Sequence, residues 1–333
     1  MKKSLLFNLC LFLFLTFSLT ACGNTASKPV EEVKEEEQNV ETELASTETE
    51  NEYIEVKHFM GTASIPKNAT KVVTLTPHFA DHVLSLGVQP IGTVVRGEGD
   101  FEPYMAELLN GTENIGQPPS PNLEKILMLK PEVMFGEEKN HVKPFDALNK
   151  IAPTIVLPQS DMEGDWRTTF MFVADALGKT DLANEKLAQF DNRVEEVKQD
   201  LEKEFKGESI LLLKVTDKEY RVLGKNIHVG TLIYDELGMT YPSSLNENEL
   251  ELPIAMEKLP EINPDHIILF EVREKSKEKY EELINNPLWS NLSAVQNENI
   301  YVFDDIKAGK AGHGLIMHNL LLDQIESELL GRD

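Results

Sequence analysis

The chain has 333 residues, and its 57 acidic and 32 basic side chains give a formal net charge of −25 at pH 7. This charge argues against nucleic acid and anionic membrane surfaces as partners, although a local basic patch could still bind an anion. Both cysteines, Cys10 and Cys22, lie near the start of the chain, so the remainder can have neither a disulfide nor a catalytic thiol.

The first residues predict export and a lipid anchor. Positive charge in Met1–Lys3 precedes the apolar run Leu5–Leu19, which is the layout of a secretory signal and is short for a membrane span. The run ends in Leu19–Gly23, which resembles the bacterial lipobox. We therefore predict a signal peptide over residues 1–21 and a lipid on Cys22. The alternative is an ordinary signal peptide with a chance cysteine beside its cleavage site.

Residues 22–52 are predicted to form a tether with no folded structure. Between Asn24 and Glu52 there are ten Glu, two Lys and no aromatic residue. Such a segment has almost nothing to bury, and its like charges repel one another.

From residue 53 onward, short apolar strands alternate with amphipathic helices, which predicts parallel sheets covered by helices. The predicted elements of this first half are a strand Val72–Leu75, a helix Pro77–Leu86, a strand Pro90–Val94, a helix from its cap Asn122 to Leu129, and strands Val133–Phe135 and Thr154–Leu157.

One predicted helix is much longer than the others. Residues 181–205 contain no Gly or Pro, and apolar side chains recur at alternating spacings of three and four. At 1.5 Å per residue this helix would be roughly 37 Å long. Periodicity alone also fits an ordinary amphipathic surface helix, but its central place suggests a connection between two lobes.

The second half repeats the pattern of the first. Predicted elements are strands Ser209–Val215 and Tyr220–Leu223, helices Gly230–Leu237 and Met256–Ile262, and a buried strand His266–Phe270. The segment Leu123–Glu132 matches Met256–Asp265 at a constant offset of 133 positions, each containing a Glu-Lys pair and later a Pro followed by an acid. Chance similarity is the alternative. We predict an N-terminal lobe over 53–179, a bridging helix over 180–206 and a C-terminal lobe over 207–333.

These features together resemble a known family. The lipobox, the two Glu-Lys segments, Leu86–Gly92, the long helix and Asn286–Val295 are similar to the solute-binding lipoproteins of ferric-siderophore, haem and cobalamin ABC importers. They form the helical-backbone class of periplasmic binding proteins, named for the single long helix that joins the two lobes. The resemblance implies an α/β fold of two Rossmann-like lobes with mostly parallel sheets, bridged by one long helix, with the ligand in the cleft between the lobes. It also implies a monomer on the outer face of the cell membrane, or the periplasmic side, with neither enzymatic activity nor resident cofactor.

In this family a glutamate on each lobe docks onto arginines of the importer's membrane subunits. The matching positions here are Glu124 and Glu257. An exposed carboxylate can accept a bidentate arginine bond and orient a large partner. The alternative is that each acid only stabilises the positive end of its own helix.

Loops that follow the strand ends should line the cleft. A cationic pocket would suit the anionic oxygens around iron in a ferric siderophore, the ligand that the resemblance implies. The alternative for any one basic residue is a solvated surface charge. The candidate ligand-binding residues are His78, Phe79, Arg96, Arg221, His228, Arg273, Lys307 and Lys310.

Residues 304–314 depart from the family pattern. Some relatives place a Trp or Tyr facing the ligand after the last strand, and this segment has neither. The siderophore class therefore stays open. The glycines here do not form a strand-to-helix phosphate loop, so nucleotide binding is not expected.

Three other functions are alternatives. Haem uptake by the same fold would need an axial ligand, for which His78 or His228 could serve, with methionines of the pocket as a second option. Direct zinc or manganese capture is less well supported, because His78 and His82 form one pair without further ligands. A surface enzyme is the third, but no nucleophile elbow or paired catalytic carboxylates were found.

Overall fold

The computed structural model describes residues 53–95, 99–163, 165–246, 251–270, 274–303 and 314–332, all within one compact unit that begins at Glu50. The predicted signal peptide, Cys22 and the tether lie outside these ranges. Within them, no helix is both long enough and apolar enough to cross a membrane.

The first lobe is built on a five-stranded sheet in which every neighbouring pair is parallel. Its central strands are buried because helices cover both faces, so they consist almost wholly of apolar residues. In spatial order the strands are β5 (Glu113–Asn114), β4 (Gly92–Thr93), β3 (Val72–Thr74), β8 (Val133–Glu137) and β9 (Thr154–Leu157).

Two small hairpins and seven short helices accompany this sheet among the described residues. The hairpins are β1 (Tyr53–His58) with β2 (Gly61–Pro66), and β6 (Gly116–Gln117) with β7 (Ser120–Pro121). The helices are α1 (Pro77–Ser85), η1 (Pro103–Met105), α2 (Leu123–Leu129), α3 (Glu138–His141), α4 (Phe145–Asn149), α5 (Gln159–Glu163) and α6 (Trp166–Ala176).

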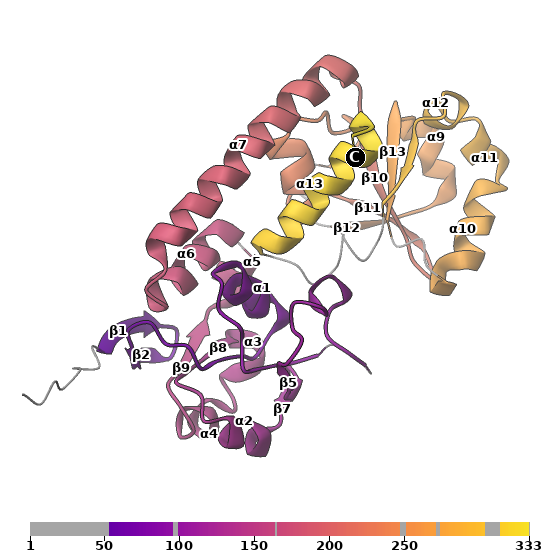
Figure 1. Ribbon diagram of the computed structural model, residues 1–333. Helices are drawn as coiled ribbons and strands as arrows, with labels where there is room; N and C mark the ends of the chain where they lie inside the picture. Colours follow the sequence, from indigo (N-terminus) through magenta and orange to yellow (C-terminus); the bar gives the residue numbers. More distant parts are fainter. Residues whose placement is uncertain are drawn as a thin grey trace, which may run out of the picture. The chain divides into compact units, whose positions relative to one another are not determined.

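The predicted long helix is α7 (Thr180–Phe205), which runs in Figure 1 along one side, from the first lobe near α6 to the second lobe. Its apolar stripe is buried, including Phe190, Val197 and Leu201, and packs in a core cluster with residues from both lobes. It ends at Lys206, whose left-handed backbone (φ 41°) stops the hydrogen-bond ladder just before Gly207. The apolar periodicity therefore reflected a helix covered along one face.

The second lobe contains another five-stranded sheet, and here only half of the pairings are parallel. Strands β10, β13 and β14 are parallel, whereas β11 and β12 run antiparallel at one side. A tight turn joins β10 to β11, with the Thr216 amide donating to the Glu219 carbonyl at 3.0 Å, and so short a link forces antiparallel pairing. The strands are β12 (Glu251–Ile254), β11 (Tyr220–Leu223), β10 (Ile210–Val215), β13 (His266–Phe270) and β14 (Ile300–Val302).

The helices of the second lobe are mostly one or two turns long. They are α8 (His228–Gly230), the π-helical turn η2 (Thr231–Glu236), η3 (Met256–Lys258), α9 (Leu259–Ile262), η4 (Glu274–Ser276), α10 (Lys277–Ile284), α11 (Pro287–Ser290), α12 (Ser293–Gln296) and the long C-terminal helix α13 (Leu315–Leu330).

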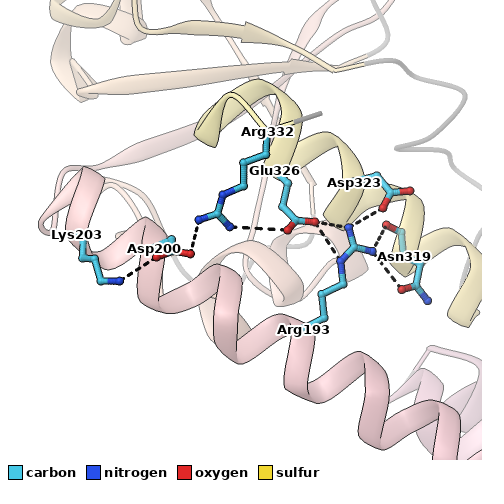
Figure 2. Close-up of polar contacts among 7 residues, drawn as sticks. All are labelled: Arg193, Asp200, Lys203, Asn319, Asp323, Glu326 and Arg332. Atoms are coloured by element: carbon cyan, nitrogen blue, oxygen red, sulfur yellow. Dashed lines mark hydrogen bonds and ion pairs between the residues drawn. The ribbon is translucent and has the colours of Figure 1, made fainter.

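Helix α13 packs beside α7 (Figure 1) in a shared apolar core. Polar contacts link the same two helices. Figure 2 shows Arg193 of α7 reaching the carboxylates of Asp323 (Nη2 to Oδ1, 2.6 Å) and Glu326 (Nε to Oε2, 3.0 Å) on α13. Near the end of both helices Arg332 pairs with Asp200. Because a guanidinium can engage several carboxylates at once, Arg193 sets the register of the two helices.

The internal repeat extends to backbone conformation. Lys130 and Asn263, which are equivalent positions, both adopt left-handed backbone (φ 51° and 39°) just before their prolines. The acid that follows each proline then accepts from the start of the neighbouring central strand: Glu132 from the Lys71 amide at 3.0 Å, and Asp265 from the Ser209 amide at 2.8 Å. Two helix-Pro-strand units therefore attach to their sheets in the same way, and the predicted α/β class with two lobes and one long helix is confirmed.

Candidate ligand-binding cleft

In each lobe the parallel strands end at one edge of the sheet, where ligands bind in open α/β folds. In the chain, Arg96 comes after strand β4, Arg273 after β13, and Lys307 and Lys310 after β14. Those four residues lie outside the described residues, so their predicted contact with ligand stays a prediction.

A charged cluster lies at this edge of the second sheet. Lys214, next to last in β10, is paired in the ladder with Arg221 of β11. The Glu251 carboxylate lies between them, 2.6 Å from Lys214 Nζ and 3.0 Å from Arg221 Nε, and Arg221 also contacts Glu219. The predicted residue Arg221 is therefore at the strand-end edge, with its charge partly balanced. Lys214 was missed, although a lysine within an apolar strand was a usable signal.

Helix α1 begins where β3 ends, and Thr76 caps it by accepting from the Phe79 amide at 3.4 Å. The helix is buried at nearly every position: His78 is 7% exposed and Phe79 is 0% exposed. The Phe79 ring packs against Phe135 with centroids 5.7 Å apart. Phe79 is thus a core residue in this structure and presents no side-chain surface to a ligand. The cause is that Phe79 faces the sheet, where Phe135 of β8 covers it.

Asp81, also on α1, accepts hydrogen bonds from the first turn of α13. Its carboxylate oxygens lie 3.0 Å from the Ile316 amide and 3.2 Å from the Met317 amide, and the hydroxyls of Ser85 and Tyr104 also donate to it. These donors offset only part of the cost of burying the charge, and burial raises the pKa of the Asp81 carboxyl to about 6.

A cavity of about 600 Å³ opens between α6 and residues 226–236. Trp166 and Arg167 line one side, His228 and Glu236 the other, and His318 of α13 stacks on Trp166 with centroids 4.5 Å apart. Arg167 crosses between the lobes: its guanidinium donates to both carboxylate oxygens of Glu236, at 3.1 and 2.7 Å, and to Asp191 of α7. His228 is the predicted ligand residue that lines this cavity.

Two histidines near the cavity belong to the core. Burial lowers the pKa of His82 and of His318 to about 3, so both rings are neutral at ordinary pH. The His318 Nδ1 lies 2.8 Å from the Gly314 carbonyl oxygen. No group of three or more His, Cys, Asp or Glu side chains among the described residues is arranged to hold a metal ion.

Glu124 and Glu257 both lie on exposed surface, at the beginning of α2 and within η3. In each lobe the lysine that follows the glutamate is bound to a different acid: Lys125 to Glu113 at 2.6 Å, and Lys258 to Glu261 at 2.9 Å. Neither Glu124 nor Glu257 makes an ion pair or side-chain hydrogen bond with any other described residue. Asn122 caps α2 as predicted, accepting from the Lys125 amide at 3.0 Å.

Comparison with known proteins identifies the family. Residues 72–306 match the family model described as periplasmic binding protein. The chain belongs to this family. It is 30% identical to the Bacillus subtilis (strain 168) protein named "Probable siderophore-binding lipoprotein YfiY", with 99% of each chain covered. It is 28% identical to "Iron(3+)-hydroxamate-binding protein YxeB" of the same organism, covering 91% of this chain and 90% of that one.

Among solved structures, this periplasmic binding protein resembles Staphylococcus aureus SirA complexed with staphyloferrin B. The TM-score is 0.70 at 28% identity, covering 83% of this chain and 98% of the other. These matches confirm the helical-backbone class expected from the sequence. The relatives are named for binding rather than for a reaction, which agrees with the expectation that the chain is not an enzyme.

The raised pKa of Asp81 predicts a pH dependence of stability. An unfolded aspartate ionises near pH 3.9, whereas folded Asp81 ionises near pH 6, so its contribution to stability is lost as pH rises from about 4 to 7. The loss over this range should be about 2 kcal/mol. We expect the free energy of unfolding of wild type minus that of Asp81→Asn to fall by this amount over that range, measured by urea unfolding. This subtraction removes the contribution of the histidines, because they titrate in both proteins. If the free energies of unfolding of the two proteins changed with pH in parallel, the Asp81 carboxyl would not be the cause of the pH dependence.

Proposed function

We propose that this protein binds a ferric siderophore between its two lobes and delivers it to the membrane subunits of an ABC importer. It works as a monomer, attached outside the cell through a lipid on Cys22. The observation that supports delivery most directly is the pair of exposed carboxylates, Glu124 and Glu257, at equivalent positions of the repeat.

The basic residues predicted to follow the strand ends support an anionic, oxygen-rich ligand. Arg96, Arg273, Lys307 and Lys310 follow strands of the two sheets in the chain and are the cations that carry this argument. Lys214 and Arg221 lie at the strand-end edge but are paired with Glu251 and Glu219, and the cavity lined by His228 also has Asp165, Asp235 and Glu236 in its wall. A ferric siderophore presents negative oxygens around the metal, which cationic side chains bind through charge-assisted hydrogen bonds. The names of YfiY, YxeB and the SirA complex point to the same kind of ligand.

Delivery requires a surface that a partner can recognise without touching the ligand. In each lobe the neighbouring lysine is occupied by a second acid, so the Glu124 and Glu257 carboxylates stay available for cations of the partner. Two carboxylates on separate lobes would define the orientation of the protein on its importer.

Ligand binding is tested by titration. We expect tight binding of at least one complex from a panel of ferric hydroxamates, catecholates and carboxylates, and at least about tenfold weaker binding of its iron-free form. Chelation arranges the donor atoms before binding, which reduces the entropic cost. Quenching of Trp166, which lines the cavity, is the signal, and a Trp289→Phe variant removes the other tryptophan's emission. Equal affinity for both forms, or binding of haem alone, would refute this assignment.

Anchoring is tested at Cys22. The Cys22→Ala protein should bind its ferric complex with unchanged affinity, yet leave the membrane fraction for the medium or accumulate as an uncleaved precursor. Detergent extraction and mass spectrometry of the N-terminus give the readout. A processed Cys22→Ala protein that still requires detergent would contradict the lipid anchor.

Delivery is tested by the Glu124→Ala/Glu257→Ala variant. Uptake of the radioactive ferric complex by cells should be abolished, while its affinity for the purified protein stays within about threefold, because loss of two interfacial charge pairs acts only on docking. Single variants should lose part of the uptake, and changes to Lys should be worse than changes to Ala. The matched control is Glu107→Ala/Glu278→Ala, which removes one exposed acid from each lobe elsewhere. Uptake at the wild-type rate by the Glu124/Glu257 variant would rule out docking through these residues.

A further inference from the structure

Helix α2 has an exposed apolar pair beside Glu124. Met128 is 80% exposed and Leu127 is 60% exposed, the highest values for large apolar side chains among the described residues. They follow Glu124 by four and three positions, and residues at these spacings are neighbours on a helix surface. The inward side of α2 packs into the core of the lobe, where Ile126 is fully buried. The outer face therefore combines one carboxylate with two apolar side chains.

A single exposed leucine or methionine is ordinary on a protein surface. Here the pair adjoins a carboxylate whose neighbouring lysine is held by Glu113, so the three side chains make a continuous surface suited to one kind of group. A guanidinium is planar and weakly hydrated, so it can pair with a carboxylate while its flat face rests on apolar side chains. Apolar contacts around such a pair also exclude water, which strengthens the charge interaction.

The second lobe lacks this arrangement. The positions equivalent to Leu127 and Met128 are Pro260 and Glu261, and Glu261 is engaged with Lys258 at 2.9 Å. Glu257 therefore lies beside other charges in open water, where an added ion pair contributes little to affinity. The repeat conserves the glutamate in each lobe but places apolar neighbours beside only one of them.

We infer that Glu124, Leu127 and Met128 form one docking surface and are the main anchor of this protein on its importer, with Glu257 as the weaker second contact. The partner that fits is an arginine surrounded by apolar side chains on a membrane subunit. This inference rests on the proposed function and adds to it an apolar contact and an inequality between the lobes.

The test is the Leu127→Gln/Met128→Gln variant, with Ile284→Gln as the matched control, since Ile284 is an exposed apolar residue on α10. Glutamine keeps helix propensity and side-chain length while removing the apolar surface. Because both side chains point into solvent, the melting temperature and ferric-complex affinity should not change. Co-isolation with the importer from detergent-solubilised membranes, and uptake of the radioactive ferric complex that binds best, should each fall at least about tenfold, and Ile284→Gln should match wild type.

A second variant separates the parts of the inference. Met128→Lys places a cation where the partner's guanidinium is expected and should reduce uptake at least as strongly as the double glutamine variant. Glu124→Ala should lose more uptake than Glu257→Ala, and equal losses would overturn the inequality between the lobes.

The remaining outcomes identify what has failed. Wild-type uptake by the double glutamine variant, together with lost uptake by Glu124→Ala/Glu257→Ala, would overturn the apolar anchor and leave the proposed function standing. Wild-type uptake by both variants would overturn docking at these sites altogether. If wild-type protein forms dimers in sedimentation experiments and the double glutamine variant does not, the apolar pair serves a second copy of the chain and the inference is wrong.

Discussion

The buried carboxylate of Asp81 holds the last helix of the chain against one of the first. Two amides at the start of α13 donate to it, and the positive end of that helix stabilises the anion. The approach is so close that a Cβ at Gly314 would lie 2.1 Å from Asp81 Oδ1, so only glycine fits there. With its start fixed on α1, α13 runs along α7, where Arg193 binds it at Asp323 and Glu326. The resulting core includes Phe79, Phe190 and Phe270, which belong to the first lobe, the bridging helix and the second lobe.

Charge pairing within the protein bears on which of its many acids can bind a partner. Cations at the contacts between elements are bound by carboxylates, as Arg167 is by Glu236 and Lys214 is by Glu251. In a chain with so many acids, the absence of a partner says little about any one acid. The position of Glu124 and Glu257 in the repeat, each followed by an occupied lysine, is the informative feature.

The local sequence pattern did not show which candidate site residues are buried in the core. His78 and Phe79 follow a strand end and were expected to face the cleft, yet they are only 7% and 0% exposed. Helix periodicity reports one buried face, and it cannot reveal a second layer supplied by α13 more than 200 positions later. The antiparallel direction of β11 was likewise missed because apolar composition alone does not specify strand direction; the four-residue turn at Thr216–Glu219 does.

The sequence by itself determined the features that depend on neighbours in the chain. The Asn122 cap, the buried strands, the uninterrupted stripe of α7 and the repeated Glu-Lys segments each arise from contacts within a few residues or from ancestry visible in the residues themselves. Only the tertiary structure decided which polar groups are buried and which charges are already paired. Asp81 meets α13 and Arg167 meets Glu236 because helices pack together, and Lys214 meets Glu251 because their strands join one sheet. These residues are far apart in the chain, and no local pattern encodes such contacts.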